Sequence, residues 1–328
     1  MTDKQKTIGK SVTISGTGLH TGQLGEITFH SAPINHGIKF RRVDIDTKPI
    51  IDADVSLVVS TARGTTLGKD NVLIYTIEHV LAAFMGMGID NVLVDINMEE
   101  IPIKDGSSMY FIEAVKEAGI VEQNAPRKYL VIKEPISIEG SDKKVKLLIE
   151  PADTFSIEVV IDYETEVLGK QSATLDSLSK FEDEISPCRT FVFLHELEFL
   201  LANNLIKGGD LNNAIVFVNR EVSQEELDKL ANLFNKPKVK VKPNGILDNL
   251  TLHWANEAAR HKLLDVIGDL ALTGIRIRGK VIANKPGHLI NTQFAKKLAK
   301  IIKTEKRNNV PQYDLILAPL MDLHQIME

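Results

Sequence analysis

The sequence predicts an α+β fold divided between two domains. Strand-like segments are followed by helix-like segments twice along the chain, the order expected when each domain packs a sheet on its own helices. A length of 328 residues with 43% hydrophobic content is enough for two cores. We expect a linker at residues 119–127, which contain Asn124-Ala125-Pro126. The predicted domains are therefore residues 1–126 and 127–308.

The chain opens with short segments in which polar and apolar residues alternate. Turn residues separate them, so we predict strands at 11–14, 26–30, 38–42 and 51–59. The run Gly16-Thr17-Gly18-Leu19-His20-Thr21-Gly22 is rich in glycine, but no helix follows it, as a phosphate-binding loop requires. His20 is either a turn residue or a site residue, and spacing alone favours the turn.

A helix is predicted to begin at Thr76, whose side chain can cap it, and to end at Gly86 and Gly88. Glu78 and His79 then lie in its first turn. An adjacent Glu and His at a helix start can present a general base and a metal ligand from one rigid element. Alternatively, Glu78 only complements the helix dipole, and without further evidence this second interpretation is favoured.

The remaining elements follow the same rules of periodicity and turn chemistry. Lys and Val alternate at residues 236–243, which predicts an edge strand protected by charge. A compact strand-helix-strand unit is expected as an insert at about residues 193–218. The other predicted strands are at 91–96, 129–132, 145–150, 156–162 and 274–283, and the helices at 107–118, 195–203, 223–234, 260–270 and 292–306.

The helix at residues 260–270 carries an unusual charged stripe. His261, Asp265 and Asp269 lie at i, i+4 and i+8 on one face, with neighbouring Cβ atoms roughly 5 to 6 Å apart. Apolar residues flank this face, and burying unpaired charges costs several kcal/mol per ion. A metal ion is the simplest partner, although a single His-x-x-x-Asp pair is more often a solvated or salt-bridged face.

The two helices together strengthen the metal hypothesis. His79, His261 and Asp265 form a set of two histidines and one carboxylate with an open position, as catalytic zinc sites require. A structural zinc site would usually use cysteines, and the sequence contains only Cys188. Glu78 would then stand beside the metal as a general base.

Composition restricts the other classes of function. The net charge is -5 and the isoelectric point is near 6.0, so the chain lacks the basic character of nucleic-acid binders. One cysteine permits no intrachain disulfide. The polar first ten residues contain no apolar signal segment, and no stretch approaches 18 apolar residues. We expect a cytoplasmic protein with at most peripheral membrane contact.

Several short motifs, taken together, resemble the zinc-dependent UDP-3-O-acyl-N-acetylglucosamine deacetylase family of lipid A biosynthesis. They occur in the order of that family over roughly residues 7–300. The motifs are Gly18-Leu19-His20-Thr21-Gly22, Thr76-Ile77-Glu78-His79, Gly88-Ile89-Asp90-Asn91, Ile101-Pro102-Ile103-Lys104-Asp105-Gly106-Ser107, Arg189-Thr190-Phe191, His261-Lys262-Leu263-Leu264-Asp265 and Gly268-Asp269-Leu270.

The resemblance implies a zinc amidohydrolase with two similar α+β domains and an active site between them. Zn²⁺ would be bound by His79, His261 and Asp265, and Glu78 would activate water. The substrate implied is a UDP-linked, 3-O-acylated amino sugar that loses its N-acetyl group as acetate.

The resemblance also assigns the remaining catalytic roles. Thr190 would stabilise the oxyanion together with the metal, and Lys262 would face the tetrahedral intermediate or the diphosphate. His288, oriented by Asp269, would assist departure of the amine. Amide hydrolysis needs an activated water, a charge sink and a proton for the leaving group, and each has a candidate here.

An acyl-chain passage is the last feature that the resemblance implies. It would be built from the strand-helix-strand insert, with Phe193, Leu197, Leu201 and Ile206 as lining residues. The same resemblance makes His20 a candidate contact for the nucleotide or the acyl group.

Two regions depart from the family pattern. Residues 219–249 form a longer connection than expected, and residues 309–328 resemble a linker that leads into a 3-hydroxyacyl-acyl-carrier-protein dehydratase beyond Glu328. Two alternative functions remain open: a zinc deacetylase of another acylated sugar, and a non-catalytic module that binds a nucleotide-linked lipid.

Overall fold

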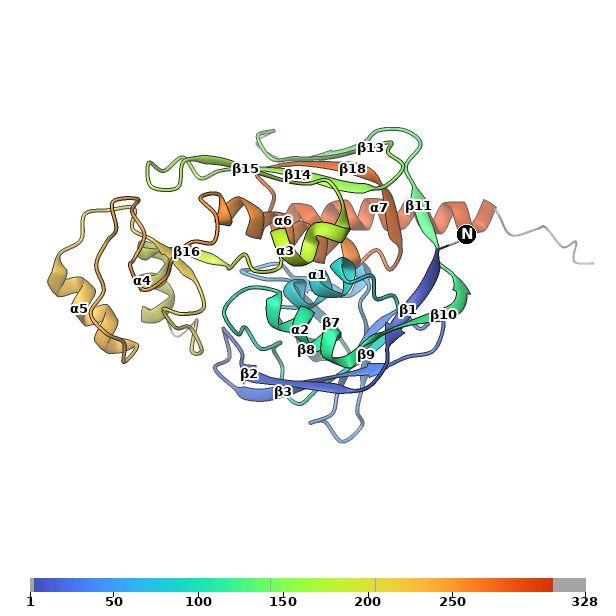
Figure 1. The fold of residues 1–328 in the computed structure, drawn as a ribbon, viewed down its shortest axis with the longest axis horizontal. Helices are drawn as coiled ribbons and strands as arrows, with labels where there is room; N and C mark the ends of the chain where they lie inside the picture. Colours follow the sequence, from blue (N-terminus) through green and yellow to red (C-terminus); the bar gives the residue numbers. More distant parts are fainter. Residues whose placement is uncertain (1–2, 142, 204, 309–328) are drawn as a thin grey trace, which may run out of the picture.

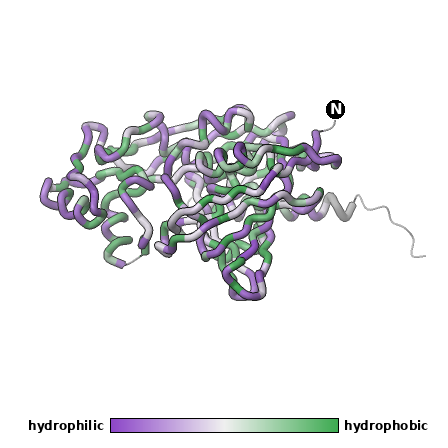
Figure 2. Tube along the Cα trace, turned by 60° about the horizontal axis from the view of Figure 1, so that its bottom comes forward, coloured by the Kyte–Doolittle hydropathy of each residue, from purple (hydrophilic) through white to green (hydrophobic). Residues whose placement is uncertain are grey.

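The computed structural model describes residues 3–141, 143–203 and 205–308, and its two main sheets enclose the helices between them (Figure 1). The tail at residues 309–328, with the linker expected there, lies outside the described residues. Hydrophobic and hydrophilic residues alternate along much of the chain trace (Figure 2), and buried and more exposed residues alternate along the long strands. This pattern is expected of sheets that bury one face and expose the other.

The first α+β unit contains a five-stranded sheet and two helices. The sheet order is β2-β3-β9-β4-β5, and each strand presents alternate apolar residues to the helices. The elements are β2 (Val12–Thr17), β3 (Leu24–Ser31), β4 (Ile38–Arg42), β5 (Ile50–Asp52), α1 (Glu78–Gly86), β9 (Val92–Ile96) and α2 (Met109–Ala118).

The second α+β unit repeats this plan. Its sheet has the order β12-β13-β18-β14-β15, and β11 adds to β18. The elements are β11 (Tyr129–Val131), β12 (Ile136–Glu139), β13 (Lys146–Glu150), β14 (Phe155–Asp162), β15 (Lys170–Leu175), α6 (Glu257–Ala271), β18 (Arg276–Asn284) and α7 (His288–Asn308).

The two sheets have the same topology. In each, the five strands follow the spatial order first, second, fifth, third, fourth, and only the pairing of the fifth with the third strand is parallel. In each unit one helix precedes the last strand and another follows it. The expectation of two similar α+β units is confirmed.

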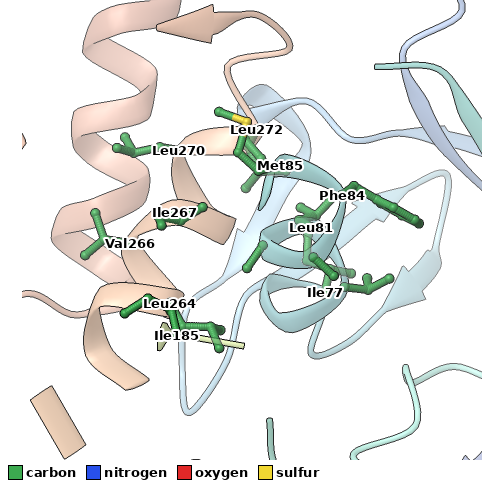
Figure 3. Packing of buried hydrophobic residues seen from close by; sticks show 14 of the residues in the cluster. Ile77, Leu81, Phe84, Met85, Ile185, Leu264, Val266, Ile267, Leu270 and Leu272 are labelled. Carbon is green, nitrogen blue, oxygen red and sulfur yellow. The ribbon is translucent and has the colours of Figure 1, made fainter. Parts of the chain in front are cut away.

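The helices α1 and α6 pack against each other at the centre of the molecule. Apolar side chains of α1, including Leu81 and Met85, face those of α6, including Leu264 and Ile267 (Figure 3). Gly268 permits this close approach, because an added Cβ there would lie 2.1 Å from the carbonyl oxygen of Glu78. The two equivalent helices of the repeat therefore share one core.

Each unit carries an insertion between its fourth strand and its central helix. In the first unit, the insertion is the helix η1 (Val55–Leu57) and a small sheet of β6 (Val58–Ser60), β7 (Thr66–Lys69) and β8 (Val72–Ile74). In the second unit it contains η2 (Leu178–Lys180), α3 (Phe181–Glu184), β16 (Phe191–Phe193), α4 (Leu194–Ala202), β17 (Ile215–Phe217) and α5 (Gln224–Leu233). The parallel pairing of β16 with β17 confirms the strand-helix-strand unit.

Three predicted segments differ in the structure. The proposed linker at residues 119–127 is mostly strand β10 (Ile120–Pro126), which pairs with β1 (Lys4–Ile8). The strand predicted at residues 51–59 is broken into β5, η1 and β6. Residues 236–243 form no edge strand in the described part of the chain, only the isolated bridge of Val241 with Leu247. Pro237 and Pro243 lack the amide donors that a ladder needs.

Helix boundaries also differ. Thr76 does not cap α1, because its backbone is left-handed with φ 59° and its hydroxyl donates to Glu100 at 2.9 Å. The last helix begins at His288 and not at residue 292 as predicted, so His288 is the first residue of a helix. Among the residues that the structure describes, none of the helices combines the length and apolar character needed to cross a bilayer.

Candidate active site

Three side chains from the two central helices converge at the interface of the α+β units. His79 comes from the first turn of α1, whereas His261 and Asp265 lie one turn apart on α6. One ligand atom from each lies within 4.8 Å of the other two, and all three residues are buried. Nε2 of His79 is 3.8 Å, and Nε2 of His261 is 3.4 Å, from Oδ1 of Asp265. The three residues expected as metal ligands are thus brought together.

The protonation of this group suits a cation. Nδ1 of His261 donates to the carbonyl of Cys188 at 3.1 Å, which leaves the lone pair on Nε2. Burial lowers the pKa of His79 to about 3, and it also lowers the pKa of His261. Burial opposes ionisation of Asp265, but Lys262 and the nearby histidines hold the pKa of this carboxyl well below its usual range.

An unsatisfied oxygen completes the case that these residues fit a metal. Oδ1 of Asp265 is buried and has no hydrogen-bond partner among the residues that the structure describes. Buried carboxylate oxygens are almost always hydrogen-bonded or bound to a cation. Two neutral imidazoles and one carboxylate are a ligand set that zinc accepts, so the residues fit the metal that the sequence resemblance implied.

Glu78, at the start of α1, lies beside His79, His261 and Asp265, which are together called the metal-ligand group. Its Oε2 accepts the backbone amide of Thr65 at 3.0 Å, and its Oε1 is 3.7 Å from Nε2 of His288. Burial raises the pKa of Glu78 to about 7, with His288 opposing the shift. A carboxyl group with a pKa near neutrality can both accept and release a proton.

His288 and Asp269 form a second buried pair. Nδ1 of His288 is 2.9 Å from Oδ2 of Asp269, which also accepts a hydrogen bond from the side-chain amide of Asn291 at 2.9 Å. Burial disfavours the imidazolium, but Asp269 and Glu78 outweigh it and raise the pKa of His288 to about 9. The expected orientation of His288 by Asp269 is therefore present, and Nε2 of His288 faces the metal-ligand group, 3.9 Å from Oδ2 of Asp265.

Lys262 projects from α6 next to the metal-ligand group. Its Nζ lies 2.8 Å from Oδ2 of Asp265 and 5.5 Å from the centre of the Phe191 ring. Burial opposes its charge, but Asp265 and Tyr163 raise the pKa of Lys262 above its usual value. A permanent positive charge therefore borders the site.

Thr190 is held at the site by its backbone and its neighbour. Its amide donates to Gly106 at 2.9 Å, and its carbonyl accepts from Ile215 at 2.8 Å. The preceding Arg189 forms a buried ion pair with Glu257, the first residue of α6, at 2.9 Å. The segment before β16 is thereby pinned to the helix that carries His261 and Asp265.

A cavity of about 640 Å³ connects the metal-ligand group to the insert of the second unit. Its polar end includes Glu78, Thr190 and Lys262, whereas its apolar walls come mainly from β16, α4 and β17. Phe193, Leu197 and Ile206, three of the residues named as candidates for an acyl-chain passage, line this cavity.

Leu201 is placed differently from the expectation. Both Leu200 and Leu201 pack against the small core of the insert, but among the described residues only Leu200 lines the cavity. The rotation of α4 about its axis decides which of two adjacent leucines faces the cavity, and adjacent helical residues point about 100° apart.

His20 also lines the cavity. Its amide and that of Thr21 donate to the buried carboxylate of Glu100, which fixes the glycine-rich loop. Nδ1 of His20 is 3.1 Å from the carbonyl of Leu205, and Nε2 is buried without a partner within the described ranges. His20 lies in a turn, as its spacing predicts, and the structure also gives it a place in the wall of the site.

Thr65, Tyr163 and Phe234 are among the residues of the site that the sequence-based candidates did not include. Thr65 donates its amide to Glu78, and its hydroxyl donates to Oδ1 of Asp269 at 2.5 Å. Tyr163 and Phe234 line the cavity, and the Tyr163 ring packs on the ring of Phe193. These residues lie in loops or at an element end, where periodicity carries no signal.

The comparisons with known proteins agree with this geometry. The family of UDP-3-O-acyl N-acetylglycosamine deacetylases matches residues 5–239 and 231–300. The bifunctional enzyme LpxC/FabZ of Bacteroides thetaiotaomicron is 43% identical over 325 residues, which cover 99% of this chain and 70% of that protein. The corresponding enzyme of Porphyromonas gingivalis is equally similar, with 43% identity over the same length.

A shorter relative gives the same result. The UDP-3-O-acyl-N-acetylglucosamine deacetylase of Saccharophagus degradans is 39% identical over 305 residues, which cover 92% of this chain and 91% of that protein. The matched residues include both central helices and the whole metal-ligand group. The chain belongs to the UDP-3-O-acyl-N-acetylglucosamine deacetylase family, a family of metalloenzymes.

Proposed function

We propose that this chain hydrolyses the N-acetyl amide of UDP-3-O-acyl-N-acetylglucosamine, releasing acetate, with Zn²⁺ held by His79, His261 and Asp265. One observation carries the proposal: the buried Oδ1 of Asp265 has no hydrogen-bond partner among the described residues and faces two neutral imidazoles, with Glu78 and His288 alongside. Relatives named as deacetylases of this substrate support the choice of reaction.

The division of labour follows from the charges at the site. A zinc ion bound to this ligand set supplies a Lewis acid that polarises the amide carbonyl and lowers the pKa of water. Glu78 is the general base that accepts a proton from the attacking water, since its pKa of about 7 suits proton transfer at neutral pH. The amide of Thr65 holds the Glu78 carboxylate in place during this transfer.

The leaving amine needs a proton, and His288 is suited to provide it. With a pKa of about 9, the imidazole is protonated at neutral pH. Asp269 holds Nδ1, so the proton on Nε2 points towards Glu78 and the metal-ligand group. Transfer of this proton to the glucosamine nitrogen makes it a better leaving group.

The negative charge that develops on the amide oxygen has two further partners in this proposal. The Thr190 hydroxyl donates a hydrogen bond to it, and the Lys262 ammonium stabilises the same charge or that of the diphosphate. The acyl chain occupies the apolar part of the cavity, where Phe193, Leu197 and Ile206 replace its contact with water.

Metal analysis combined with a product assay tests the proposal. Purified protein should contain one zinc per chain and release acetate from UDP-3-O-acyl-N-acetylglucosamine. Protein without stoichiometric zinc, or unable to release acetate when zinc is supplied, would contradict it. Release of acetate only from a different acylated sugar would retain the chemistry but replace the substrate.

Two variants separate the proposed roles. Glu78→Ala should retain zinc but lose about 10²- to 10⁴-fold in kcat, because it removes a general base and no ligand. Asp265→Ala should lose zinc, because it removes the only charged ligand of the set. Equal loss of zinc from both variants would refute this division.

The bifunctional relatives support one further proposal about the protein as a whole. We propose that a 3-hydroxyacyl-acyl-carrier-protein dehydratase follows residue 328 in the full-length protein. Sequencing of the gene beyond this codon tests it, and an immediate stop codon would contradict it.

A further inference from the structure

Residues 219–249 form an additional layer on the outer side of the insert. The family match breaks into two segments within this region, at residues 231–239. Ser223 caps α5 in a capping box with Glu226, so the helix has a well-defined start. Figure 1 shows α5 beyond α4, on the side away from α1 and α6.

This layer is packed on the insert through a second small core. Leu227, Leu230 and Ala231 of α5 are buried together with Leu194 and Leu197 of α4. Burying these three apolar side chains stabilises the attachment of the layer to the insert. The layer is therefore a fixed part of the wall.

Polar contacts hold the layer at both ends. Arg220 pairs with Glu198 of α4 at 2.6 Å, and Lys236 pairs with Asp210 at 2.9 Å. The side-chain amide of Asn249 donates to the carbonyl of Leu211. Asp210 and Leu211 themselves line the cavity, so these contacts tie the layer directly to the cavity wall.

Phe234 is the residue that this layer contributes to the cavity. It follows the last turn of α5, where its amide donates to the carbonyl of Leu230 at 3.3 Å. Its ring lines the cavity together with Leu200, Leu211 and Val216. The metal-ligand group lies on α1 and α6, whereas Phe234 ends α5, the helix that Figure 1 shows beyond α4 and farthest from those two helices.

We propose that Phe234 closes the outer end of the acyl cavity and sets the longest acyl chain that the protein accepts. The proposal rests on the proposed function, since it assigns the cavity to the 3-O-acyl chain. A chain too short to reach Phe234 leaves apolar surface unfilled, and each missing methylene lowers affinity about fourfold. A chain too long must displace an aromatic ring that the packed layer holds in place.

Substitution of Phe234 tests this end wall. In Phe234→Ala the preferred acyl length should increase, and kcat/KM should rise about fourfold for each methylene that newly fits. In Phe234→Trp the preferred length should decrease. The measurement is kcat/KM for acetate release across a series of UDP-3-O-acyl-N-acetylglucosamines that differ only in acyl length.

Leu233→Ala is the matched control. Leu233 adjoins Phe234 but is 64% exposed, and it is not among the described residues that line the cavity. It should leave the length profile unchanged. A profile that is the same in wild type, Phe234→Ala and Phe234→Trp would overturn the proposal, as would an equal shift in Leu233→Ala.

A binding experiment separates this proposal from the proposed function. Calorimetric titration of the same proteins with straight-chain fatty acids of increasing length reports on the cavity without turnover. If no protein released acetate but Phe234→Ala still preferred longer fatty acids, the proposed reaction would fail and the end wall would stand. If the variants released acetate and their preferred acyl length were unaltered in both assays, the proposed reaction would be retained and the proposed role of Phe234 would be refuted.

Discussion

Thr65 connects the two halves of the proposed catalytic machinery at the level of single residues. Its amide holds Glu78 at 3.0 Å, and its hydroxyl donates to Asp269 at 2.5 Å and lies 3.3 Å from Nδ1 of His288. The residue is fully buried. One side chain therefore fixes the carboxylate that orients His288, while its backbone fixes the proposed base.

Removal of the Thr65 hydroxyl should lower turnover without removing the metal. Thr65→Val keeps the shape but leaves Oδ1 of Asp269 without its donor, and we expect a loss of about 10- to 100-fold in kcat with little change in KM. Thr65→Ser, which restores the donor, should recover most of the activity. Steady-state kinetics, zinc content and melting temperature of both variants provide the measurement.

The outcomes of that comparison are distinct. Equal activity of Thr65→Val and wild type would show that the hydroxyl is dispensable. If Thr65→Ser were as impaired as Thr65→Val, packing of the methyl group would be responsible and the hydrogen bond would not. A loss of zinc in either variant would contradict a role confined to Glu78, Asp269 and His288.

At the level of elements, the site depends on how closely α1 approaches α6. Each helix carries part of the metal-ligand group, and Gly268 allows the backbone of α1 to contact α6 at the first residue, Glu78. The position is one turn from Asp265, so a shift of either helix there changes the separation of the ligands. The backbone of Gly268 has an ordinary helical conformation that any residue could adopt. Glycine is needed at this position because a side chain would collide with the backbone of α1.

Gly268→Ala should therefore impair both stability and metal binding. The new Cβ would lie 2.1 Å from a backbone oxygen, and forcing the helices apart should cost about 1 to 3 kcal/mol of unfolding free energy. Urea unfolding and zinc affinity measure the two effects.

Gly287→Ala is the control for that experiment, because an added Cβ there would meet open space among the described residues. It should change the unfolding free energy by less than about 1 kcal/mol. Unaltered stability and zinc affinity of Gly268→Ala would show that the interface can relax, and would contradict the close-packing argument.

At the level of the whole molecule, Arg276 joins the two units on the side of α1 opposite the metal-ligand group. It comes from β18 of the second unit and donates to the carbonyls of Met85 at 2.5 Å and Ile89 at 3.0 Å, at the C-terminal end of α1. Its Nε is 3.3 Å from Oδ1 of Asp90. A cation at a helix C-terminus is favourable, so Arg276 holds α1 by the end opposite to Glu78 and His79.

Arg276→Met should destabilise the molecule by about 1 to 3 kcal/mol, because it leaves buried carbonyls without donors. Arg127 still pairs with Asp90 at 2.7 Å, which limits the loss. Denaturant unfolding gives the measurement. Arg278→Met, at an exposed position two residues along the same strand, removes only a surface contact with the Tyr129 ring and should cost less than about 1 kcal/mol. Equal effects of the two variants would contradict a specific role of Arg276 between the units.

Local sequence patterns were sufficient to predict the two central helices and most of the strands. The i, i+4 spacing of His261 and Asp265, and the adjacency of Glu78 and His79, are determined by helical geometry once the helices are recognised. The motif resemblance added the roles of Thr190, Lys262 and His288, which spacing alone does not assign. The strand predicted from the Lys-Val alternation at residues 236–243 was wrong. Alternation alone does not make a strand there, because the two prolines of this segment have no backbone N–H to donate to a neighbouring strand.

The sequence by itself determined the type of fold, the metal-ligand candidates and the family, because these depend on residue identity and on periodicity within single elements. Only the tertiary structure decided that Leu200 and not Leu201 lines the cavity, that Thr65 links Glu78 to Asp269, and that Phe234 contributes to the cavity wall. Helix rotation, loop placement and the docking of α5 depend on contacts between distant segments, and the packing of the whole chain sets those contacts.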